Sequence, residues 1–139
     1  MLKHFIPILG FISSFGFAQN SNLTVSVTEI KNNTGSLTAE LHNSKGTFLK
    51  TSYKAVSTQI KSNTASVTFT GIPKGEYTVL VYHDENKNGK LDKYFIGMPK
   101  ESVAVSNNAK GFMGPPKYDE AKFTVTADTK INIKMTKAH

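Results

Sequence analysis

Short stretches of alternating apolar and polar residues run along most of the chain, and this period-two pattern is typical of half-buried strands. The alternating stretches cover residues 23–28, 37–42, 66–70, 123–126 and 131–135. Residues 77–82 are apolar at nearly every position. Such a stretch predicts a central strand that is covered on both faces. Clusters of Asn, Gly, Pro, Asp and Thr between the stretches predict turns.

About seven short strands with few helices predict an all-β fold, an antiparallel β-sandwich of the immunoglobulin-like or transthyretin-like kind. The turn cluster Asn32–Gly35 predicts that strands 23–28 and 37–42 form a hairpin. Residues 47–61 combine helical spacing of apolar residues with a composition that favours strands. We expect a short helix or turn at 47–51, followed by a strand at 54–61.

The first eighteen residues have the pattern of a signal peptide. Lys3 and His4 precede an uncharged apolar stretch, and Gly16 and Ala18 place small residues before a cut at Gln19. The apolar stretch is shorter than the roughly 20 residues that a membrane-spanning helix requires, although an uncleaved anchor is the alternative. We therefore expect a secreted or periplasmic product, a single domain of residues 19–139 with no transmembrane segment after cleavage.

Composition excludes several classes of site. The formal net charge is +7, yet every basic residue is Lys, and Cys is missing. A chain without Cys has no disulfide framework, cysteine nucleophile or thiolate metal site. A chain without Arg lacks the side chain that most often reads nucleic acid by bidentate contacts. An extracytoplasmic protein or a glycan is the expected partner, and nucleic acid is not.

Residues 84–121 form a long insertion without an extended strand or helix pattern. Connections beyond about 12–15 residues are unusual in compact domains. This one is rich in Gly and Pro, yet it also holds Tyr94, Phe95 and Phe112, which are too apolar for a solvated linker. We expect the insertion to be ordered, with the amides of Asn107 and Asn108 satisfying backbone groups of the loop.

The insertion opens with a motif that matches the front of an EF-hand-type calcium loop, D-x-N-x-N-G-x-x-D. The expected metal ligands are Asp84, Asn86, Asn88, Lys90 and Asp92. Lys90 would bind through its backbone carbonyl, and the others through their side chains. Calcium prefers six to eight oxygen ligands, and the glycine at loop position 6 permits the sharp turn. Position 12 is Phe95 rather than the usual bidentate Glu, so Glu101 and Asp119 are the candidates for further ligands.

Three other interpretations stay open. Asn88-Gly89 is also a good type I′ hairpin turn that needs no metal. A glycan- or surface-binding module could use the aromatic residues Tyr94, Phe112 and Tyr118. A hydrolase could place His83, Asp92 and Glu101 at a cleft, but no nucleophile elbow supports catalysis, and we expect no enzyme. His42 and His83 lack further ligands at metal spacing, so we expect surface or capping side chains.

Three blocks of the insertion resemble a family signature. They read His83-Asp84-Glu85-Asn86-x-Asn88-Gly89-Lys90-x-Asp92, then Gly97-x-Pro99-Lys100-Glu101, then Ser106-Asn107-Asn108-Ala109-x-Gly111-x-x-Gly114-Pro115-Pro116. Together with the flanking strands they resemble a bacterial secreted family, the domain of unknown function 2141. The turn Ile72-Pro73-x-Gly75-x-Tyr77 is similar to that of transthyretin-like and collagen-adhesin B-type modules. The resemblance implies a small exported β-sandwich and supplies no catalytic residue.

Overall fold

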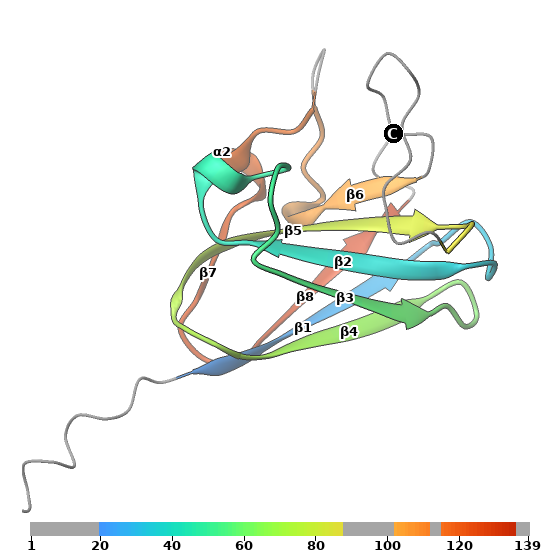
Figure 1. Cartoon of the computed structure of the whole chain (residues 1–139), viewed down its shortest axis with the longest axis horizontal. Helices are drawn as coiled ribbons and strands as arrows, with labels where there is room; N and C mark the ends of the chain where they lie inside the picture. Colours follow the sequence, from blue (N-terminus) through green and yellow to red (C-terminus); the bar gives the residue numbers. More distant parts are fainter. Residues whose placement is uncertain (1–19, 88–101, 112–114, 136–139) are drawn as a thin grey trace, which may run out of the picture.

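A computed structural model describes residues 20–87, 102–111 and 115–135 of the chain, and in it two β-sheets face each other (Figure 1). The first sheet has the strand order β4 (Ala65–Ile72), β1 (Ser21–Thr28), β8 (Thr129–Lys134). The second has the order β3 (Lys54–Gln59), β2 (Ser36–His42), β5 (Gly75–Asp84), β6 (Val103–Val105), and β7 (Phe123–Val125) pairs with the start of β5. The predicted all-β sandwich is confirmed.

The predicted hairpin between the first two strands is wrong. β1 pairs with β4 and β8 in one sheet, whereas β2 pairs with β3 and β5 in the other. The turn at residues 32–35 therefore carries the chain from one sheet to the next, with Gly35 in the left-handed region at φ 75°. The pair β1–β8 is parallel, and all other described strand pairs are antiparallel.

The apolar positions of the alternating stretches form the core between the two sheets. Both sheets contribute fully buried side chains, among them Leu23, Val25, Phe69, Leu37 and Leu41. Burying one such side chain contributes about 1.5–3 kcal/mol. The alternation in the sequence thus assigns each strand its inner face correctly.

Strand β5 is buried along both of its faces, as the sequence predicts. Val79 and Val81 point into the main core, while Leu80 on the opposite face belongs to a second, smaller cluster with Val105 and Ala121. Phe48 and Leu49 pack against this smaller cluster. The second face of the five-stranded sheet is therefore covered, rather than open to solvent.

Two short segments supply this cover. One begins with the 3-10 helix η1 (Lys45–Thr47), and the other is the helix α2 (Tyr118–Ala121). We call Phe48, Leu49, Tyr118 and Ala121 the outer cover. The expected helix or turn followed by a strand is confirmed, although the helix lies at 45–47 rather than 47–51.

The insertion contains β6, the 3-10 helix η2 (Ser106–Asn108) and α2 within its described residues. The predicted role of the asparagines is confirmed for Asn107, whereas Asn108 binds the backbone of β8 rather than that of the loop. The Asn107 Nδ2 donates to the carbonyls of Glu120 and Lys122 at 3.1 and 2.9 Å. The Asn108 Oδ1 accepts from the Lys134 N–H at 2.9 Å. These amides fasten η2 to α2 and to β8.

The predicted signal peptide, residues 1–18, lies outside the described residues. Within the described ranges, no helix has both the length and the apolar character that crossing a membrane requires.

Candidate functional site

The candidate calcium loop begins at the last residue of β5. Asp84 lies there on the outer face of the sheet, in register with Ser36, and is 1% exposed. Asn86 follows two residues later and is exposed. The Lys87 N–H donates to the Asp84 carbonyl at 3.3 Å, and Lys87 has a left-handed φ of 55°. The chain therefore turns sharply within the first four positions of the motif.

Only part of the predicted ligand set can be placed. Asp84 and Asn86, at loop positions 1 and 3, are described. The other four expected ligands lie outside the described residues: Asn88, Lys90, Asp92 and Glu101. Within the described ranges, no three His, Asp or Glu side chains come together as a metal site.

Asp119 lies far from Asp84. Its carboxylate pairs with the Lys122 ammonium at 3.6 Å, and the same ammonium lies 3.7 Å from Glu76. Glu76 is the second residue of β5, whereas Asp84 is its last residue. At about 3.3 Å per residue, these ends are separated by roughly 25 Å. The structure therefore does not bring Asp119 to the start of the loop.

The turn between β1 and β2 holds the start of the loop. The His83 Nε2 lies 2.6 Å from the Thr34 carbonyl oxygen. Gly35 lies directly against the backbone of Asp84 and Glu85, and a Cβ atom on Gly35 would approach the Glu85 Cα to 2.7 Å. Only glycine combines this contact with a left-handed φ at low cost. Neither Thr34 nor Gly35 was identified as part of the site from the sequence.

Both candidate histidines are fully buried, so the expectation of surface side chains is wrong. His83 shares the core face of the sheet with Leu37, its partner in register. It caps the Thr34 carbonyl, which is consistent with the capping role we expected. His42 points to the opposite face, next to Thr78 in register. The two rings thus belong to different layers of the structure.

His42 is buried beneath the outer cover. Its Nε2 is 3.6 Å from the Glu40 carboxylate, and the Phe48 ring packs edge-on at 6.1 Å between centroids. Among the described residues neither ring nitrogen has a hydrogen-bond partner, and neither does the Thr78 hydroxyl. Burial lowers the pKa of His42 and raises the pKa of Glu40. Burial therefore favours the neutral form of His42 over the charged form.

Tyr118 is not the exposed aromatic platform that a glycan-binding interpretation requires. It is 7% exposed, its ring packs edge-on against Phe48 at 5.7 Å, and its hydroxyl donates to Glu76 at 2.7 Å. Burial, with the hydrogen bond to Glu76, raises the pKa of Tyr118 to about 12. The side chain therefore anchors the outer cover to β5.

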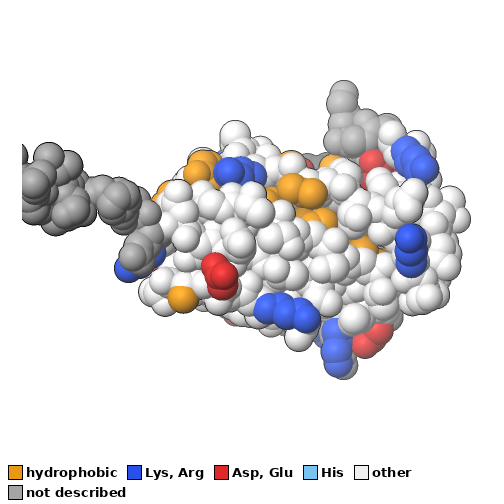
Figure 2. All heavy atoms as spheres, turned by 90° about the horizontal axis from the view of Figure 1, so that it is seen from below, with side chains coloured by type: hydrophobic (Ala, Val, Ile, Leu, Met, Phe, Trp, Pro, Cys, Tyr) orange, Lys and Arg blue, Asp and Glu red, His pale blue; other side chains and the backbone are white. Residues whose placement is uncertain are grey.

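The positive charge is dispersed on the face that Figure 2 shows. Its lysines stand apart from one another, separated mostly by backbone and by other uncharged residues. Two of the described lysines pair with carboxylates, Lys122 with Glu76 and Asp119, and Lys134 with Glu29. Such spacing does not favour nucleic acid as a partner.

Comparison with known proteins gives one match. The model of the family described as "Uncharacterized protein conserved in bacteria (DUF2141)" matches residues 25–134. No curated protein and no solved structure matches the chain. The matched range includes the second half of β1, the turn at Gly35, the calcium motif and the asparagine pair.

Substitution of Gly35 tests how strongly the turn holds the loop. Gly35→Ala should destabilise the protein by roughly 2–4 kcal/mol, because the methyl group meets backbone atoms and the left-handed φ disfavours alanine. Gly46→Ala is the matched control, since a Cβ there has no neighbour within 4 Å. Denaturant unfolding of both variants measures the difference. Equal stabilities would show that the turn does not constrain Asp84.

Substitution of His42 tests its buried neutral state. Because the pKa of His42 is lowered from 6.5, its contribution to stability is full above that value and is lost as pH falls through the folded-state pKa. His42→Leu should therefore weaken the loss of stability between pH 7 and pH 5. At pH 7.5 it should change the free energy of unfolding by no more than about 1 kcal/mol, because it removes buried groups without partners.

Urea unfolding across this pH range measures the effect. Glu40→Gln serves as the control, since the raised pKa of Glu40 acts with the opposite sign, stabilising the folded state at low pH. An unchanged pH profile in His42→Leu would contradict the buried neutral state.

Proposed function

We propose that this chain, which belongs to the DUF2141 family of bacterial proteins, is an exported, non-enzymatic binding module with a calcium-stabilised loop at residues 84–92. Export and cleavage follow from the signal-peptide pattern of residues 1–18. The partner is an extracytoplasmic protein or glycan.

The observation that carries the calcium proposal is the position of Asp84. A carboxylate that is 1% exposed stands at the first position of an oxygen-rich motif, at the end of the central strand. The turn at Lys87 curls the backbone immediately after it. A calcium loop needs this arrangement, because its first ligand must be fixed while the next ligands curl around the ion.

The donor set suits a hard cation. Asp84 and Asn86 would hold calcium together with Asn88, Asp92 and the carbonyl of Lys90, and Glu101 is the remaining candidate for a further ligand. Asp119 is excluded from this set by its distance along β5. When bound, the ion would cross-link points of the insertion that are separated in the sequence, which would offset part of the entropy cost of ordering it.

The competing functions have less support. A metal-free turn at Asn88-Gly89 accounts for the loop but gives no reason for carboxylates at both ends of the motif. A hydrolase would need His83 at a cleft, yet His83 is buried against Leu37 and bound to Thr34. A glycan-binding module that stacks sugars on aromatic rings could not use Tyr118, because this side chain is buried.

Calcium should stabilise the mature protein. With a Kd of about 10 μM, millimolar calcium would add about 2.7 kcal/mol to the free energy of unfolding. Asp92→Asn should abolish this increment, because it removes a charged ligand while leaving the buried Asp84 in place. Asp119→Asn, an equal change in charge at the other end of β5, should keep it. Calorimetric titration and melting curves in calcium and in chelator measure both effects.

The outcomes separate the alternatives. If melting temperatures are the same in calcium and chelator, the metal-free turn is correct. If both variants lose the same increment, calcium acts as a general screening ion and not as a ligand-bound one.

Export should remove the first eighteen residues. The intact mass of the protein recovered from the periplasm or medium should correspond to a chain that starts at Gln19. Gly16→Leu and Ala18→Leu place bulky residues before the cut, and should lead to accumulation of the uncleaved precursor. A full-length product in the membrane fraction of the unmodified protein would indicate an anchor instead.

A further inference from the structure

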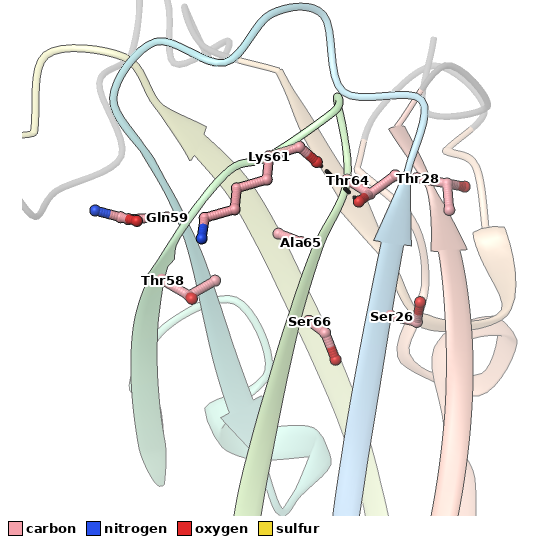
Figure 3. Close-up of a pocket in the computed structure, with 8 residues that line it drawn as sticks. All are labelled: Ser26, Thr28, Thr58, Gln59, Lys61, Thr64, Ala65 and Ser66. Carbon is pink, nitrogen blue, oxygen red and sulfur yellow. Dashed lines mark hydrogen bonds between the residues drawn. The ribbon is translucent and has the colours of Figure 1, made fainter.

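A polar groove lies between the edge strands of the two sheets, and its volume is about 690 Å³ (Figure 3). The residues lining it come from the ends of β1 and β3, the following turn and the start of β4: Ser26, Thr28, Thr58, Gln59, Lys61, Thr64, Ala65 and Ser66. This volume falls within the range of small-molecule sites, roughly 300–1,000 Å³. Seven of these eight lining residues have polar or charged side chains, and the eighth is Ala65.

The groove is a product of the fold. β3 belongs to the five-stranded sheet and β4 to the three-stranded sheet, and the turn from Lys61 to Thr64 joins them. Ser62 and Asn63 both have positive φ, and the Thr64 N–H donates to the Lys61 carbonyl at 3.0 Å. Asn63 is tied to the segment after β1, through its Nδ2 to the Ile30 carbonyl at 2.8 Å. The end of the groove is therefore rigidly held.

The chemistry of the lining selects for an anionic ligand that is rich in hydroxyl groups. The lining includes five hydroxyl side chains and one amide, groups that form hydrogen bonds as sugar hydroxyls do. The Thr64 hydroxyl already donates to the Lys61 carbonyl at 3.0 Å, and the Gln59 side chain points away from the other lining residues (Figure 3). Lys61 is the charged residue in the lining, and no carboxylate lines the groove. Its side chain extends between β3 and β4 toward Thr58 (Figure 3). Within the described ranges, no carboxylate lies within ion-pair distance of Lys61.

We propose that this groove binds an acidic oligosaccharide, with a uronate carboxylate on the Lys61 ammonium and sugar hydroxyls on the Ser and Thr side chains. Charge complementarity supports an anion, since the whole chain carries +7. A peptide partner would need apolar pockets for its side chains, and Ala65 is the groove's one apolar residue. Single-stranded nucleic acid would need aromatic stacking surfaces, which the lining lacks.

This inference shares one premise with the proposed function, namely that the protein is a binding module. The groove contains no predicted calcium ligand. It can therefore be tested in chelator, where failure of the calcium proposal has no effect on the result. Chelator also prevents calcium from cross-linking a uronate polymer.

The test is calorimetric titration of the mature protein with oligogalacturonides in chelator at low salt, beside the methyl esters of the same oligosaccharides. The acid form should bind, and the uncharged ester should bind about five- to tenfold more weakly, because it lacks the charge-assisted contact. Lys61→Gln should weaken binding of the acid form by the same factor. Lys74→Gln, an exposed lysine at the other end of the sandwich, is the matched control and should change binding less than twofold.

A second pair of variants tests the location without removing a lysine. Ser66 and Thr70 are both exposed on β4, but only Ser66 lines the groove. Ser66→Glu should abolish binding by repelling the uronate, and Thr70→Glu should not. Absence of binding, equal losses in both members of a pair, or equal affinity for poly-glutamate would each overturn the proposal.

Discussion

Strand β5 is buried on both faces, and much of the structure follows from this constraint. Its inner face completes the sandwich core, while Leu80 and Thr78 on its outer face need a cover of their own. The segment after η1 and the helix α2, which lies at the end of the long insertion, provide this cover. Ser106 joins α2 to the strand, since its hydroxyl accepts from the Val79 N–H and donates to the Ala121 carbonyl. The insertion is thus partly a second layer of the fold.

This second layer explains why polar groups are trapped in the interior. On β2 the alternation places Thr38, Glu40 and His42 on the outer face of the sheet. This is the pattern of a strand that has one face in contact with water. The outer cover then removes His42 from solvent, and burial shifts the pKa values of His42 and Glu40 in opposite directions. The alternation of a single strand contains no information about a cover formed by residues far away in the chain.

The correct predictions depend on neighbouring residues in the sequence, and the wrong ones depend on contacts between distant parts of the chain. Strand positions and the doubly buried central strand depend on local pattern, and the sequence indicated them. The sequence also indicated that the Asn107 amide satisfies backbone groups of the loop, but not that Asn108 binds β8, 26 residues away. The hairpin between β1 and β2 was wrong because a turn cluster marks a reversal of the chain but does not choose the partner strand. Asp119 was proposed as a ligand from its nearness in sequence, whereas β5 and α2 place it at the opposite end.

The candidate site depends on one short segment that the sequence analysis treated only as a turn. Residues 30–35 bind the turn at Asn63, the ring of His83 and the backbone at Asp84. They lie between the polar groove and the start of the calcium motif, and they hold both in place. The contact of Gly35 is with backbone atoms, so it fixes the position of Asp84 whatever its side chain binds. In the proposed calcium loop, the first ligand is therefore positioned by the fold itself, before any ion binds.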